Sequence, residues 1–257
     1  MRAILLDIDG VLLQQNGAIP GAADTLNWLT QQGIPWRCIT NTTSRPAGAI
    51  AAQCQTAGLS VAETQIFNPV RTAVRWLRQQ GISRLHLLVA ADIRADFSEF
   101  DLHSPDPQAI VIGDIVQAFS MATLNPLFRL FMDNPQRPLL ALGMTRYFAA
   151  ADGLQLDVGP FVKALEYATG RPALVMGKPD KTVFELALAD MGVAAADAVM
   201  LGDDRYSDVL AAQALGITGI LVQTGKYRPG DEHADADGKR PDHCLASVAA
   251  LPQWLAG

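Results

Sequence analysis

Cysteine is scarce in this sequence of 257 residues, and its placement argues against the common thiol-based sites. The cysteines are Cys38, Cys54 and Cys244, and no Cys-x-x-Cys pair or Cys/His cluster occurs. A structural zinc site needs such a cluster and is therefore not expected. An odd and sparse set of thiols suits a reducing compartment. Because no signal-peptide pattern follows Met1 either, the sequence predicts a cytoplasmic protein.

Excess basic charge and long apolar runs are also missing. The formal net charge is -6 at pH 7, whereas nucleic-acid-binding domains typically carry a basic patch. No stretch approaches the ~18 apolar residues of a membrane-spanning helix. Neither nucleic acid nor a membrane is therefore expected as a partner. What the chain does have is 49% hydrophobic and 18% charged residues, which is enough apolar material for a full core.

Strand-like and helix-like segments alternate along most of the sequence. Helical periodicity is clear where Val70, Ala73, Val74 and Leu77 fall on one face, just after Pro69. Such alternation indicates βαβ units, a mostly parallel sheet and an α/β fold. The strands expected are residues 4–8, 34–39, 85–89, 109–112, 139–142, 173–176, 198–201 and 217–222.

Two acidic residues, Asp7 and Asp9, end the first expected strand. Side chains two residues apart in an extended chain point to the same side. The carboxyl edge of an open parallel sheet is where ligands bind, and buried charge there needs compensation, for which a divalent cation is suited. Two such carboxylates can divide the work, one attacking and the other moving a proton. Taken alone, an Asp-x-Asp pair is more often a helix cap or a turn.

Phosphate-binding groups follow two further expected strands. Thr40 and Asn41 come directly after residues 34–39, where a hydroxyl and backbone N–H groups can cradle a phosphate. Lys178 follows residues 173–176 and can neutralise both a phosphate and a carboxylate. Each segment also has an ordinary interpretation, because Thr40 can cap a helix and Lys178 can be a solvated lysine in a turn.

A second acidic cluster follows the strand expected at residues 198–201. It consists of Asp203, Asp204 and, four residues further along, Asp208. A capped helix start explains one aspartate but not three, and a cation would relieve their mutual repulsion. Hard oxygen ligands with few histidines favour Mg²⁺ over zinc.

The four segments, taken in order, resemble the four motifs of the haloacid dehalogenase (HAD) superfamily. The long interval between Thr40 and Lys178 is similar to the subclass, IIA, that inserts its cap there, typified by the N-acetylglucosamine-operon phosphatase. Further segments resemble the branch that holds the HAD-like hydrolase domain-containing proteins and the phospholysine/phosphohistidine/inorganic pyrophosphate phosphatase. Those segments are Gly159-Pro160-Phe161-Val162, Ala164-Leu165-Glu166-Tyr167-Ala168, Gly177-Lys178-Pro179-Asp180-Lys181-Thr182 and Thr224-Gly225-Lys226-Tyr227-Arg228.

The resemblance implies an α/β fold with a Rossmann-like parallel-sheet core, residues 1–68 and 172–257, and an inserted α/β cap of the C2 type, residues 69–171. It implies a Mg²⁺-dependent phosphatase in which Asp7 attacks phosphorus, forming an aspartyl-phosphate, and Asp9 acts as acid and base. It assigns the metal to Asp7, Asp9, Asp203 and Asp208. It assigns the phosphoryl oxygens to Thr40, Asn41 and Lys178, and it allows a homodimer through the cap.

The cap departs from the pattern of many subclass members. Where those carry an Asn-Pro-Asp-like segment near the substrate, this chain has Gly143-Met144-Thr145-Arg146-Tyr147-Phe148. Arg146 and Tyr147 are the candidate substrate contacts, with an ordinary strand-end pair as the alternative. In the first motif, which contains Asp7 and Asp9, some relatives in the branch replace the second carboxylate with serine. This chain keeps Asp9, which favours catalytic competence.

Other functions fit the sequence less well. A dehalogenase on this fold would need neither a metal nor Asp9 and Asp203, and a phosphomutase would carry its cap between Asp9 and Thr40, where the interval is too short. A non-catalytic module that binds a phosphorylated ligand on the same fold is the remaining alternative. The substrate is expected to be a small phosphorylated metabolite, a phosphoamide or pyrophosphate, with phosphoamino acids, sugar phosphates and nucleotides all open.

Overall fold

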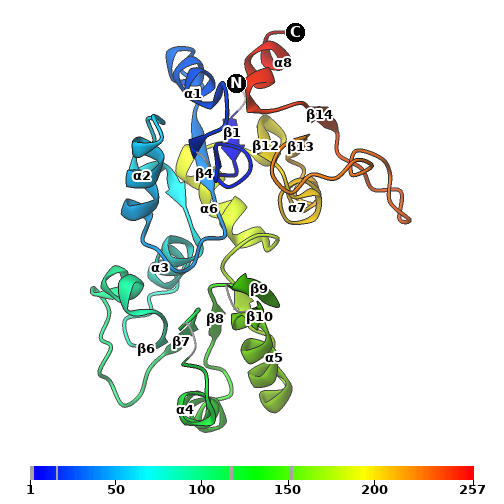
Figure 1. The fold of residues 1–257 in the computed structure, drawn as a ribbon. Coiled ribbons are helices and arrows are strands. Elements are labelled where there is room, and N and C mark those ends of the chain that lie inside the picture. The colour runs from blue at the N-terminus through cyan, green and yellow to red at the C-terminus, as the bar shows by residue number, and fades with distance from the viewer. Residues whose placement is uncertain (1–2, 16, 116–117, 151–152) are drawn as a thin grey trace. The chain divides into compact units, whose positions relative to one another are not determined.

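The computed structural model describes residues 3–15, 17–115, 118–150 and 153–257. These form two compact units, each built around a parallel sheet of its own (Figure 1). The first unit comprises Met1–Thr40, Ala47–Asn68 and Lys178–Gly257, and the second comprises Asn41–Pro46 and Pro69–Gly177. The α/β fold class expected from the alternating pattern is confirmed.

The first unit contains a six-stranded parallel sheet in the order β14-β13-β12-β1-β4-β5. The N-terminal strand β1 lies inside this sheet, between β4 and β12, so it is buried on both faces and paired along both edges. This explains its unbroken apolar sequence, which is typical of central parallel strands. The strands are β1 (Ala3–Leu6), β4 (Trp36–Ile39), β5 (Ile66–Phe67), β12 (Ala198–Gly202), β13 (Thr218–Val222) and β14 (His243–Leu245).

Helices cover both faces of this sheet. On one face, α1, α2 and α8 pack against Ile4, Leu6 and Val199, and on the other face α6 packs against Leu5 and Met200. Alternate residues of β1 thus serve two separate clusters of apolar side chains, as the period of a strand requires. The α-helices of the first unit are α1 (Ala22–Gln31), α2 (Ala47–Thr56), α6 (Lys181–Met191), α7 (Ala211–Gln213) and α8 (Leu251–Ala256). Its short 3-10 helices are η1 (Glu63–Gln65), η3 (Ala195–Asp197) and η5 (Val248–Ala250), and η4 (Arg205–Leu210) is π-helical. Its remaining strands, β2 (Leu13–Gln14) and β3 (Gly17–Ala18), form a hairpin.

The second unit contains a four-stranded parallel sheet in the order β11-β8-β7-β6. Helix α3 packs on one face, against Val111 and Leu140, and helices α4 and α5 pack on the other, against Ile110 and Ile112. Its elements are α3 (Pro69–Gln79), β6 (Leu85–Leu88), η2 (Ala91–Phe97), β7 (Ala109–Ile112), α4 (Met121–Asp133), β8 (Leu139–Ala141), β9 (Tyr147–Ala150), β10 (Gly153–Leu156), α5 (Val158–Thr169) and β11 (Leu174–Val175).

The end of the second unit differs from the boundary expected from the sequence. The expected inserted segment stops at residue 171, whereas the second unit continues to Gly177. The reason is β11, which pairs in parallel with β8 and so belongs to the four-stranded sheet. The polar stretch from Gly225 to Asp242 contains no helix or strand. None of the helices in the described ranges combines the length and apolar character needed to cross a membrane.

Candidate active site

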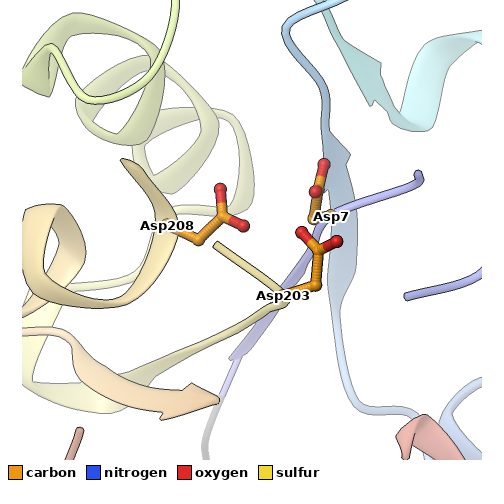
Figure 2. Close-up of side chains that lie close together, drawn as sticks. All are labelled: Asp7, Asp203 and Asp208. Atoms are coloured by element: carbon orange, nitrogen blue, oxygen red, sulfur yellow. The ribbon is translucent and has the colours of Figure 1, made fainter. Parts of the chain in front are cut away.

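Three buried aspartates lie together at the carboxyl edge of the six-stranded sheet. Asp7 follows β1, Asp203 follows β12, and Asp208 lies on η4. Strands β1 and β12 are parallel neighbours with Leu6 opposite Leu201, so their following residues emerge at the same edge. One carboxylate oxygen from each aspartate lies within 4.8 Å of the others, and Figure 2 shows the three side chains gathered there. We call this group the aspartate cluster.

Lys178 supplies the positive charge inside the cluster. Its Nζ lies 2.7 Å from Asp7 Oδ1 and 2.7 Å from Asp208 Oδ1, and its side chain is only 3% exposed. A buried lysine is costly unless it is paired. The two short contacts therefore explain how the chain holds this ammonium group in its interior.

The aspartate cluster and Lys178 together have three carboxylates and one ammonium group, and their pKa values reflect that imbalance. Burial raises the pKa of Asp7, with the Lys178 ammonium acting in the opposite direction. Burial also raises the pKa of Asp208, to about 6, and the nearby Asp7 charge adds to the rise. Burial would lower the pKa of Lys178, but the charges of Asp208 and Asp7 raise it above its usual range. The site therefore has room for further positive charge.

Asp203 offers an oxygen that could receive that charge. Its Oδ2 accepts a hydrogen bond from the Lys226 backbone N–H at 2.7 Å. Its Oδ1 is buried and has no hydrogen-bond partner among the described residues. Buried polar atoms are normally satisfied, so an unpaired carboxylate oxygen on a residue that lies beside two other carboxylates indicates a cation site. The aspartate cluster fits a divalent metal ion, and burial raises the pKa of Asp203 in its absence.

Two glycines allow the loops around Asp203 to close. A Cβ on Gly10 or on Gly225 would lie 2.0 Å from Asp203 Oδ2, and both residues have positive φ, +87° and +62°. The Thr224 hydroxyl donates a hydrogen bond to the Gly10 carbonyl at 2.5 Å. Only glycine fits this close approach. The site thus depends on Thr224, Gly225 and Lys226, for which no role in the site was expected from the sequence.

The structure places the other predicted residues as follows. Asp9 lies two residues after Asp7 with an exposed side chain, and it is not a member of the aspartate cluster. Thr40 is buried at the end of β4, where its backbone N–H bonds to the Phe67 carbonyl at 3.1 Å. Asn41, Arg146 and Tyr147 belong to the second unit, and their side chains are exposed.

Two family models match the chain. One, described as haloacid dehalogenase-like hydrolase, matches residues 4–103, and the other, described as HAD-hydrolase-like, matches residues 175–251. Together they contain every member of the aspartate cluster and Lys178. The chain belongs to the haloacid dehalogenase-like hydrolase family, as its motifs indicated.

Relatives that match about nine tenths of the chain identify its branch within the family. It is 38% identical over 245 residues to the phospholysine phosphohistidine inorganic pyrophosphate phosphatase of Homo sapiens, covering 93% of this chain and 90% of the relative. It is 41% identical over 232 residues to the haloacid dehalogenase-like hydrolase domain-containing protein 2 of Rattus norvegicus, covering 90% and 88%. The expected branch is therefore confirmed, and the chain is a phosphatase of this family.

Solved structures show the same fold. The p-nitrophenyl phosphatase from Archaeoglobus fulgidus superposes with a TM-score of 0.87 at 22% identity, covering 98% of each chain. NagD from E. coli K-12 superposes with a TM-score of 0.85 at 23% identity, covering 97% of each chain. At these identities the likeness establishes the fold alone.

Proposed function

We propose that this chain hydrolyses a small phosphorylated metabolite, a phosphoamide or pyrophosphate through an aspartyl-phosphate on Asp7. The observation that supports this most directly is the position of Asp7, whose buried carboxylate is held 2.7 Å from the Lys178 ammonium and beside Asp203. Phosphoryl transfer depends chiefly on positioning and charge neutralisation, which this arrangement provides. The names of the relatives make phospholysine, phosphohistidine and inorganic pyrophosphate the first substrates to try.

Asp7 is the proposed nucleophile. One of its carboxylate oxygens attacks phosphorus while the bond from phosphorus to the leaving group breaks, and the aspartyl-phosphate forms. The Ile8 backbone N–H donates to Asp7 Oδ1 at 2.8 Å and orients the carboxylate. Lys178 favours the ionised, nucleophilic form of Asp7, and the proposed metal would do the same.

Asp9 is the proposed acid and base. It gives its proton to the leaving group in the first step, and it then removes a proton from the water that attacks the aspartyl-phosphate. That second step releases phosphate and regenerates the Asp7 carboxylate. The exposed side chain of Asp9 suits a group that must meet both substrate and water.

The remaining predicted residues would bind the phosphoryl group and the metal. The Thr40 hydroxyl, the Asn41 amide and the Lys178 ammonium are proposed to hold phosphoryl oxygens. Mg²⁺ is the proposed metal, held by the carboxylates of Asp7 and Asp203 and the main-chain carbonyl of Asp9, with Asp208 supporting it. The ion would neutralise charge on the phosphoryl oxygens.

The second unit is the proposed cap, with Arg146 and Tyr147 as substrate contacts. Closure of such a unit would exclude bulk water during the reaction. The hairpin of β9 and β10 exposes three large apolar side chains, Tyr147, Leu154 and Leu156, and this supports the proposal of a homodimer through the cap. Action on small metabolites in the cytoplasm remains part of the same proposal.

Hydrolysis of p-nitrophenyl phosphate tests the function. We expect turnover that needs a divalent metal, is lost with EDTA and falls by about 10³-fold or more in Asp7→Asn, because an amide cannot form the acyl phosphate. Asp24→Asn, an exposed change of the same kind on α1, is the matched control and should leave turnover intact. Turnover that survives both EDTA and Asp7→Asn would contradict the mechanism. Binding of phosphorylated ligands without any turnover would instead favour the non-catalytic module.

A further inference from the structure

A pocket of about 290 Å³ lies beside the aspartate cluster, within the first unit. It begins at Asp203, which belongs to both the cluster and the pocket. The Lys226 backbone N–H bonds to Asp203 Oδ2 at 2.7 Å, so this loop is fixed directly to the cluster. The residues that matter here are Asp203, Asp204, Arg205, Tyr206, Lys226 and Arg228.

The cationic side chains of the pocket are weakly paired. The guanidinium of Arg228 has no hydrogen-bond or ion-pair partner among the described residues. Lys226 Nζ is 3.4 Å from Asp204 Oδ2, a long contact for a side chain that is 66% exposed. Arg205 is buried, and its Nη2 donates to the Lys239 carbonyl and lies 3.7 Å from Asp235 Oδ2, but its Nε is buried with no partner in the described part of the chain. Three cationic groups therefore have binding capacity to spare.

Two of the three carboxylates that line the pocket, those of Asp204 and Asp231, are bound by backbone N–H groups, and the third, that of Asp203, belongs to the aspartate cluster. Asp204 Oδ1 accepts hydrogen bonds at 3.0 Å from two backbone N–H groups, those of Tyr206 and Ser207. Asp231, which also lines the pocket, accepts at 2.8 Å from the Arg228 backbone N–H. Backbone dipoles thus bind Asp204 and Asp231 and leave the side-chain cations to face the space. A group that enters this pocket should therefore be anionic.

We propose that Lys226 and Arg228 bind a second acidic group of the substrate, a phosphate or carboxylate other than the one that reacts. This inference rests on the proposed function, because the pocket shares Asp203 with the site where the phosphoryl group would react. Lys226 and Arg228 would then determine specificity, favouring substrates with two acidic groups over those with a single phosphate. Arginine suits this role, since its fork of donors matches phosphate and carboxylate oxygens.

Matched substrate pairs test the proposal. 3-Phosphoglycerate and glycerol 3-phosphate share a three-carbon skeleton and differ in one carboxylate. Fructose 1,6-bisphosphate and fructose 6-phosphate differ in one phosphate. We define the preference as the ratio of kcat/KM within a pair, and we expect the wild-type protein to prefer the member with the second acidic group by about tenfold or more in at least one pair.

Substitutions of Arg228 and Lys226 test whether the substrate preference comes from the pocket. Arg228→Gln and Lys226→Met should each lower the preference about tenfold, the effect of losing one charge-assisted contact, while Arg228→Lys should keep most of it. Lys181→Met is the matched control, because Lys181 is equally exposed at 66% but pairs with Glu185 instead. It should leave the preference unchanged.

The outcomes separate this proposal from the proposed function. If p-nitrophenyl phosphate and every pair go unhydrolysed, the proposed function fails. If p-nitrophenyl phosphate is hydrolysed but neither pair shows a preference, the pocket proposal is overturned while the function stands. A preference that survives both Arg228→Gln and Lys226→Met also overturns it, since the selecting charge would then lie elsewhere.

Discussion

Gly10 and Gly225 show how closely single residues define the candidate site. Their backbones meet around the Asp203 carboxylate, and a Cβ on either would approach Asp203 Oδ2 to 2.0 Å. We expect Gly10→Ala to destabilise the protein by roughly 1–3 kcal/mol, because the methyl group clashes and the φ of +87° is strained for alanine. Thermal denaturation would measure this, and the variant should also lose most of its response to added metal.

Gly58→Ala separates the clash from the backbone strain. Gly58 has a similar φ of +84°, but a Cβ there would meet nothing within 4 Å. This control should therefore carry the strain alone and keep the response to metal. Equal losses in the two variants would show that the contact with Asp203 is unimportant.

The site was predictable at the residue scale only where a strand ends in a polar side chain. Asp7, Lys178 and Asp203 follow apolar runs, so their convergence could be expected from the topology of parallel sheets. Lys226 could not be assigned in this way, since its contribution to the cluster is a backbone N–H, which every residue except proline has. Its contact with Asp203 joins residues 23 apart in the sequence, and no local pattern records it.

At the scale of elements, a buried arginine fixes the C-terminal end of α4 in the second unit. Arg137 donates to the carbonyls of Leu130 and Pro107 and pairs with Asp106 at 2.9 Å. We expect Arg137→Leu to lower the free energy of unfolding by about 3 kcal/mol, because the buried contact with the Pro107 carbonyl would be lost and the Leu130 carbonyl would keep only the Asn134 N–H. Urea denaturation would measure the loss.

Arg84→Leu is the control for that prediction. Arg84 pairs with the same Asp106, but at 3.6 Å and with a side chain that is far more exposed. Exposed ion pairs contribute little, so this variant should lose less than about 1 kcal/mol. A loss as large as that of Arg137→Leu would contradict the importance of the buried carbonyl contacts.

Long apolar elements were predictable from the sequence, and short or exposed ones were not. The range 109–112 coincides with β7, and the ranges expected for β1, β4 and β13 are close to those observed. β5 has only Ile66 and Phe67, too few residues to show a period. The hairpin of β9 and β10 was missed because Leu154 and Leu156 are exposed, and a strand without a buried face does not follow the expected alternation.

At the scale of the whole molecule, metal binding should be visible as a pH-dependent gain in stability. Burial raises the pKa values of Asp7, Asp203 and Asp208, the last to about 6, so in this pH range the metal-free fold binds more protons than the unfolded chain. Its stability therefore falls as pH rises through those values, while the deprotonated carboxylates bind a cation more strongly. We expect Mg²⁺ to raise Tm more at pH 7.5 than at pH 5.

The gain in stability from metal binding follows from mass action and is about 2.7 kcal/mol when the Mg²⁺ concentration is 100 times Kd. Asp203→Asn should abolish it, because the variant loses the charge on the oxygen that has no hydrogen-bond partner. Asp204→Asn is the control, since the neighbouring Asp204 lies outside the aspartate cluster. A gain in Tm that is the same at both pH values, or that survives Asp203→Asn, would contradict the assignment.

The interior position of β1 has a consequence for synthesis on the ribosome. This strand is translated before the other strands of its sheet, yet one of its two neighbours, β12, is encoded almost two hundred codons later. Until then the nascent polypeptide carries an apolar strand with an open edge, the kind of surface that aggregates. Chaperones would have to shield it during elongation, and truncated translation products that stop before β12 should be degraded rather than accumulate.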